Sequence, residues 1–97
     1  MKYLLILLIT LSISASEKIT VSFCTEVYDL SAMIMKMRQE NTPIKDLIDV
    51  FYGNKTGINI VVQAYKQPRY STEGHQKNAI KDFANLQMTQ CLSSINK

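Results

Sequence analysis

The chain has 97 residues, with 11 Lys and Arg against 8 Asp and Glu, and a formal net charge of +3. This length corresponds to one domain. The charges are dispersed along the chain, whereas a nucleic-acid-binding protein concentrates basic residues on one face, so we expect no nucleic-acid partner. One histidine and two distant cysteines give no metal-binding spacing, so we expect no metal and no cofactor.

Residues 1–16 have the composition of a secretory signal peptide. Lys2 precedes an apolar run over residues 3–13, and the small residues Ser14–Ser16 follow. We predict cleavage after residue 16, with cleavage after Ala15 as the alternative, and a single domain over residues 17–97, in the periplasm or secreted. A retained anchor is the alternative. The apolar run is shorter than the roughly 20 residues that span a bilayer, so we expect no stable membrane span after cleavage.

The two cysteines, Cys24 and Cys91, are predicted to form a disulfide. Outside the reducing cytosol such thiols pair readily. A crosslink closing so long a loop contributes about 4 kcal/mol in the loop-entropy model. That contribution is large for a small domain, whose hydrophobic core is marginal.

A first helix is predicted from about Ser22 to Gln39. Its apolar residues recur at spacings of three or four, which is the period of one helix face: Phe23, Val27, Leu30, Ile34 and Met37. Met33, Met35 and Met37 are interpreted as core residues, with an adaptable binding surface as the alternative.

A second helix is predicted after Pro43, with Thr42 as its N-cap and Gly53 as a left-handed stop beyond its end. Its apolar stripe comprises Ile44, Leu47, Ile48 and Phe51.

The third segment, Ile58 to Gln67, is ambiguous over residues 58–63. Its β-branched residues favour a strand, but a helical stripe also exists: Ile58, Val61, Val62 and Tyr65. No second strand is available to pair with it, so we predict a helix that Pro68 ends.

The fourth helix is predicted to begin after Ser71 or Thr72 and to extend past Cys91. Its expected inner face comprises Ile80, Ala84, Met88, Cys91 and Ile95, flanked by Phe83 and Leu92. The disulfide would place the first and last helices side by side and antiparallel. The predicted fold class is therefore all-α, a small four-helix domain with its first and last helices joined by a disulfide.

The stretch Ala64–Tyr70 is the most distinctive candidate for binding, because Tyr65 and Tyr70 flank a Pro-Arg turn that contains Arg69. Tyr and Arg are enriched at interface hot spots. The alternative is that these side chains only pack over the turn. His75 has no orienting partner in the sequence pattern, so we predict no catalytic residue and expect that the protein is not an enzyme.

Several short runs resemble a group of small exported proteins encoded by bacteriophages and prophages of Gram-negative bacteria. The runs are Cys24, Ala32–Gln39, Ala64–Tyr70, Ala79–Phe83 and Cys91. The resemblance covers most of residues 17–97. It implies export, an all-helical fold and a disulfide, and it carries over no catalytic residue.

The leading hypothesis is an exported binding or inhibitory protein with a protein partner in the cell envelope. A phage setting suggests lysis control, superinfection exclusion or toxin neutralisation. The alternative is a periplasmic acid-stress chaperone, in which the carboxylates drive an opening at low pH. A secreted enzyme is the least favoured hypothesis.

Overall fold

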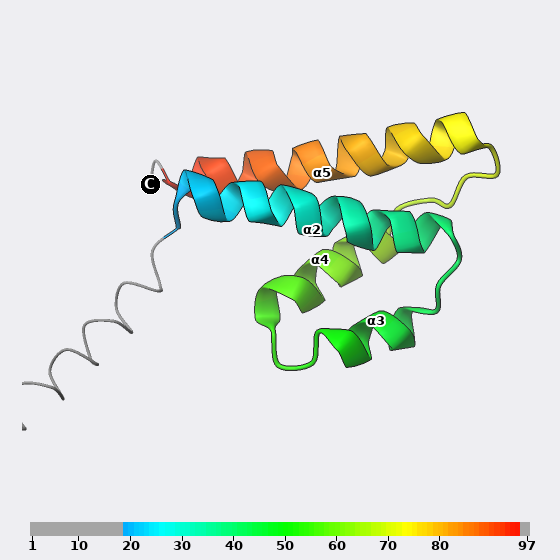
Figure 1. The fold of residues 1–97 in the computed structure, drawn as a ribbon, viewed down its shortest axis with the longest axis horizontal. Helices are drawn as coiled ribbons and strands as arrows, with labels where there is room; N and C mark the ends of the chain where they lie inside the picture. Colours follow the sequence, from blue (N-terminus) through cyan, green and yellow to red (C-terminus); the bar gives the residue numbers. More distant parts are fainter. Residues whose placement is uncertain (1–18, 96–97) are drawn as a thin grey trace, which may run out of the picture.

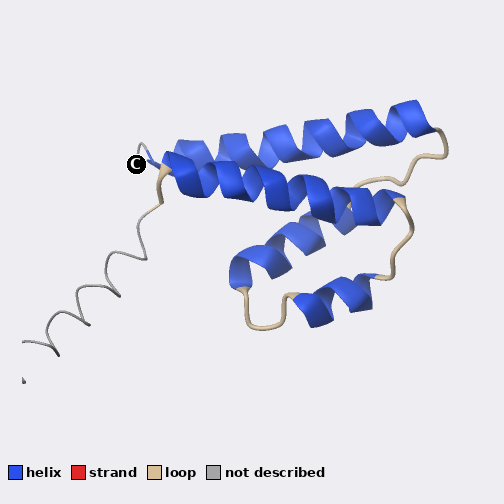
Figure 2. Ribbon diagram, viewed as in Figure 1, coloured by secondary structure: helices blue, strands red, loops and turns tan. Residues whose placement is uncertain are grey.

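The computed structural model describes residues 19–95 and contains four helices in that part of the chain (Figures 1 and 2). They are α2 (Val21–Gln39), α3 (Ile44–Val50), α4 (Lys55–Tyr65) and α5 (Glu73–Ile95). No strand occurs among these residues, so the all-α prediction is confirmed, including the helix over residues 58–63. The predicted signal peptide, residues 1–16, lies outside the described residues.

The two long helices, α2 and α5, lie side by side and antiparallel (Figure 1). Helix α4 packs against α2, and α3 packs against α4 on the side away from α5. The predicted disulfide is present: Cys24 in the first turn of α2 is bonded to Cys91 near the end of α5, with 5.6 Å between their Cα atoms. The bond holds one end of the α2–α5 pair together.

The core lies where α2, α4 and α5 meet. Its buried apolar residues are Val27, Ile34, Met35, Leu47, Ile60, Val61, Ala64 and Phe83. Met35 is therefore a core residue as predicted, and Met37 packs partly against the core, but Met33 is exposed.

The predicted inner faces of α4 and α5 are confirmed in part. In α4 the buried residues are Gly57, Ile60, Val61 and Ala64, so the predicted Val61 is buried, whereas Val62 is exposed. In α5 they are Phe83, Ala84 and Gln87; Ala84 was predicted, and Ile80 and Cys91 pack partly against the core, but Ile95 is exposed. Gly57 and Gln87 were not predicted, because an apolar stripe leaves out glycine and polar residues.

Side-chain caps explain where two helices begin. The Thr20 hydroxyl accepts from the backbone N–H of Phe23 at the start of α2. The Asn54 side chain accepts from the N–H of Gly57, so α4 begins at Lys55, earlier than predicted.

The predicted Thr42 cap is wrong. Pro43 occupies the N-cap position of α3 and makes no side-chain capping bond. Thr42 instead uses its carbonyl oxygen, which accepts from the Tyr65 hydroxyl. Gly53 has a φ of 83°, as expected of a left-handed turn residue, although α3 already ends at Val50.

Candidate functional site

The turn between α4 and α5, residues 66–72, is fastened to the end of α2; we call it the α4–α5 turn. The Arg38 guanidinium donates to the carbonyl of Gln67 from Nε at 3.1 Å and from Nη2 at 2.9 Å. The Gln39 side chain donates from Nε2 to the carbonyl of Pro68 at 2.9 Å. Its Oε1 accepts from the N–H of Tyr70 at 2.8 Å. One buried amide therefore satisfies two backbone groups of the turn.

The candidate residues Tyr65 and Arg69 also contact the rest of the fold. The Arg69 Nε donates to the carbonyl of Gln39 at 3.0 Å. The Tyr65 hydroxyl donates to the carbonyl of Thr42, and the Arg38 guanidinium carbon lies 5.2 Å from the centre of the Tyr65 ring. Both candidates thus help to join α4 and the turn to the α2–α3 connection.

The environment of Tyr65 keeps its hydroxyl protonated. Burial raises the pKa of Tyr65 above its ordinary value, and the Asp46 carboxylate adds to the rise. The Arg38 guanidinium opposes it, but its effect is smaller than that of burial. The neutral phenol is the form that donates to Thr42.

The side chain of Tyr70 is exposed to solvent and can contact a partner protein. Its ring is 39% exposed and lies 6.0 Å from the His75 ring, centre to centre. The Gln76 side chain donates to the Tyr70 carbonyl at 2.6 Å. Arg69 is also exposed, whereas Tyr65 is half-buried. The structure brings the three predicted residues to one end of the molecule, with Arg69 and Tyr70 facing solvent.

His75 forms one polar side-chain pair beside this turn. Its Nδ1 lies 2.8 Å from the Thr72 hydroxyl. Within residues 19–95, no carboxylate hydrogen bonds with the imidazole, and no group of three His, Cys, Asp or Glu could hold a metal ion. Activation of a hydroxyl by histidine requires a third group that orients the base. The prediction that the protein is not an enzyme stays a prediction.

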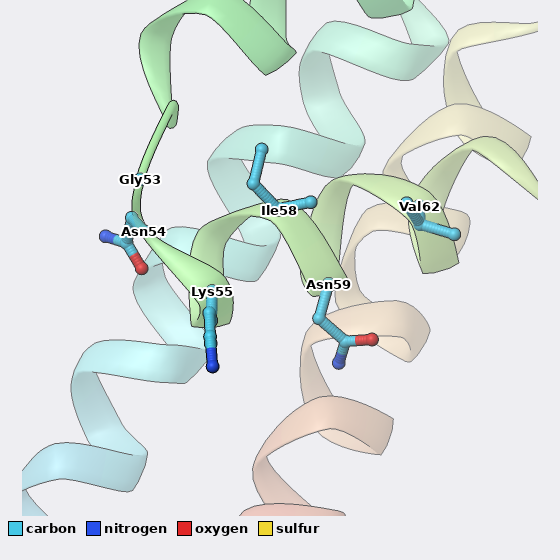
Figure 3. A pocket seen from close by; sticks show the side chains of 6 residues that line it. All are labelled: Gly53, Asn54, Lys55, Ile58, Asn59 and Val62. Carbon is cyan, nitrogen blue, oxygen red and sulfur yellow. The ribbon is translucent and has the colours of Figure 1, made fainter.

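A shallow hollow of about 440 Å³ lies on the outer surface of α4 (Figure 3). It is lined by Gly53, Asn54, Lys55, Ile58, Asn59 and Val62. Lys55 and Asn59 lie one turn apart and point to the same side of the helix (Figure 3). The one ionisable residue that lines the hollow is Lys55.

The ion pairs are relevant to the alternative function, a chaperone that opens at low pH. Lys45 pairs with Asp49 at 3.3 Å and Lys77 with Glu73 at 3.6 Å, each pair within one helix and each side chain largely exposed. Exposed pairs of this kind contribute little to stability. Protonating their carboxylates would therefore provide little driving force for opening.

Arg38 and Gln39 fasten the turn but were not among the predicted site residues. Gln39 is the more buried of the two. It is 1% exposed and lies at the end of α2. One signal points to it: Val27, Ser31, Met35 and Gln39 follow one another at intervals of four, and all are buried. A polar residue that continues an apolar helix face is a candidate for a buried hydrogen-bonding role.

No protein family model, no curated protein and no solved structure matches this chain. None of the helices within residues 19–95 is long and apolar enough to cross a membrane.

Proposed function

We propose that this chain is an exported helical binding protein that contacts a protein of the bacterial cell envelope through Arg69 and Tyr70, with Tyr65 supporting the turn. The observation that carries the proposal is the fastening of the α4–α5 turn to α2 by Arg38, Gln39 and Arg69. The turn is held in place while the Tyr70 ring remains 39% exposed.

A fixed turn lowers the cost of binding. Ordering a mobile loop on association opposes affinity, and a loop that is already ordered avoids much of that cost. Tyr and Arg are the side chains that most often anchor protein interfaces. The side chains exposed on this turn are thus suited to recognition.

The disulfide supports the exported setting. Disulfides persist in oxidising compartments and are rare in the cytosol, and Cys24 and Cys91 are bonded. An inhibitory role in an envelope, such as lysis control, superinfection exclusion or toxin neutralisation, follows from the resemblance to phage-encoded exported proteins.

Site-specific crosslinking in intact source cells tests the proposal. Tyr70 is replaced by the photoreactive p-benzoylphenylalanine, and the same replacement at Tyr52, which is 87% exposed in the α3–α4 turn, is the matched control. We expect one envelope protein to crosslink at position 70 and not at position 52. Absence of that adduct, or the same adducts at both positions, contradicts the proposal.

Binding and stability are then measured separately, with this protein and the crosslinked envelope protein in purified form. Tyr70→Ala removes the ring but keeps the backbone N–H that donates to Gln39. We expect it to weaken binding about tenfold or more with an unchanged melting temperature. Tyr52→Ala should leave both unchanged. A matching loss of binding and melting temperature in Tyr70→Ala would show that the ring is structural.

A further inference from the structure

A second candidate site lies at the other end of the molecule, beside the disulfide. Two hollows of about 210 and 200 Å³ adjoin there, and both are lined by Phe23, Val27 and Thr56. Because they share these walls, they form one groove, which we call the disulfide-end groove. Cys91 belongs to its lining.

Uncharged amide side chains converge on the larger hollow. Asn59 comes from α4, and Gln87 and Gln90 come from α5. Gln87 is only 7% exposed, whereas Asn59 and Gln90 are exposed at the surface. These three amides present both donors and acceptors to whatever occupies the groove.

The remaining lining adds an aromatic surface and little charge. Phe23 is 37% exposed and is shared by both hollows. Glu26, in the smaller hollow, is the one charged side chain among the lining residues. An aromatic face carries partial negative charge and attracts the weakly positive C–H groups of a sugar ring. The groove thus offers amide groups that can hydrogen bond with hydroxyls, an aromatic surface for a sugar ring, and little charge, as a neutral, hydroxyl-rich ligand requires.

We propose that the disulfide-end groove binds a neutral oligosaccharide. Hydroxyl and acetamide groups both donate and accept, as do the amides of Asn59, Gln87 and Gln90. Each hollow is smaller than the roughly 300–1,000 Å³ of drug-sized pockets. Two adjoining hollows of this size suit consecutive rings of a linear chain, with Phe23 between them.

A peptide occupant fits this groove less well. The walls are built from helices α2, α4 and α5, whose backbone groups are bonded within each helix. They offer no sheet edge to which an extended peptide could add a strand. A helical peptide would need several apolar anchor pockets, but amide and hydroxyl groups occupy much of this lining.

The site is independent of the proposed protein interface. Phe23 lies in the first turn of α2, whereas Gln39, which holds the α4–α5 turn, is its last residue (Figure 1). Failure of one proposal therefore leaves the other standing.

Titration followed by nuclear magnetic resonance tests the inference on the disulfide-bonded exported chain. The probes are cellotetraose and chitotetraose, with tetraglycine as the peptide comparison. We expect either tetrasaccharide to cause saturable shifts in the side-chain amide signals of Asn59, Gln87 and Gln90. No saturable shift with either sugar, or a stronger response to tetraglycine, overturns the proposal.

Substitutions locate the binding. Asn59→Leu and Gln90→Leu alter exposed residues and should each weaken sugar binding about fivefold to tenfold, as expected for one lost hydrogen bond. Phe23→Ala should weaken it by at least as much. Asn85→Leu, on an exposed position of α5 outside the groove lining, is the control. Equal losses in the control and the groove variants would contradict the assignment.

Discussion

Gln39, together with Arg38, joins the α4–α5 turn to the end of α2. The side chain of Gln39 donates to the Pro68 carbonyl and accepts from the Tyr70 N–H, and its backbone carbonyl accepts from Arg69. An amide suits this position because it donates and accepts at once. The nearby Tyr65 hydroxyl donates a further hydrogen bond, to the carbonyl of Thr42.

Replacing Gln39 should lower the free energy of unfolding. Gln39→Leu keeps much of the side-chain volume but leaves the Pro68 carbonyl and the Tyr70 N–H without their partner. We expect the free energy of unfolding to fall by about 1–3 kcal/mol, because the part-buried Pro68 carbonyl and Tyr70 N–H lose their hydrogen bonds to the side chain. Urea denaturation measures the change. Gln90→Leu, at an exposed position, should change stability by less than about 0.5 kcal/mol. Equal effects would mean that the Gln39 contacts contribute nothing.

Tyr65 should make stability sensitive to alkaline pH. The pKa of Tyr65 in the folded state is raised above its ordinary value of 10.0. The contribution of the phenol to the free energy of unfolding is therefore fully present below about pH 10 and is lost as the pH rises through the folded pKa. Tyr65→Phe should cost about 1 kcal/mol at neutral pH. The difference from the unmodified protein should shrink above about pH 10, where the phenol ionises. Urea denaturation from pH 7 to 11 tests this, with Tyr52→Phe as control. A difference independent of pH would refute it.

At the scale of the elements, α3 is the least secured helix. It has seven residues, no side-chain cap and one buried residue, Leu47. The contact between Phe51 and Gly57 brings the end of α3 against the start of α4. A Cβ added at Gly57 would lie 2.6 Å from Cδ1 and 2.9 Å from Cγ of the Phe51 ring. The glycine is therefore needed for close approach.

Two glycine substitutions separate packing from helix propensity. Gly57→Ala gains up to about 1 kcal/mol in propensity but must displace the Phe51 ring at a cost of about 1–3 kcal/mol, so we expect a net loss of up to about 2 kcal/mol in unfolding free energy. Gly74→Ala, in the first turn of α5, meets nothing within 4 Å and should be neutral or stabilising by up to about 1 kcal/mol. Thermal denaturation compares them. A Gly57→Ala protein as stable as Gly74→Ala would show that the ring moves freely.

At the scale of the whole molecule, two fastenings hold the helices together from opposite ends. The disulfide joins α2 and α5 at one end, and the Gln39 network ties the α4–α5 turn to α2 at the other. Each fastening adjoins one of the two proposed binding sites.

Removing the disulfide should destabilise the whole domain. A crosslink between residues 67 apart contributes about 4 kcal/mol in the loop-entropy model, a large part of the stability of a small domain. We expect a reductant to lower the melting temperature followed by circular dichroism. A Cys24→Ala/Cys91→Ala protein should already melt at the lower temperature and should not respond to reductant. An unchanged melting temperature on reduction, or free thiols in protein recovered from the envelope, would contradict this prediction.

The exported form should begin at Ser16 or Glu17, because the small residues Ser14–Ser16 follow the apolar run. Mass spectrometry of protein recovered from the periplasm or the medium gives the mature mass directly. A mass that retains residues 1–13 would favour an uncleaved anchor instead.

The sequence by itself determined the local features of this protein. Apolar periodicity predicted all four helices, including the ambiguous residues 58–63, because no partner strand exists for them. Gly53 was predicted to be left-handed, and it is. The disulfide was predictable because the chain has two cysteines. These features depend on nearest neighbours or on composition, which can be read along the chain.

Only the tertiary structure decided which faces are buried and what the polar residues do. The burial of Gly57 and Ala64 in α4 was not predicted, because their small size matters only when α2 and Phe51 pack against them. Gln39 and Pro68 are bonded across 29 positions of sequence. The groove likewise combines Phe23 with Gln87 from another helix. Such relations arise from packing in three dimensions, because contacts between helices depend on their rotation and not on their period alone.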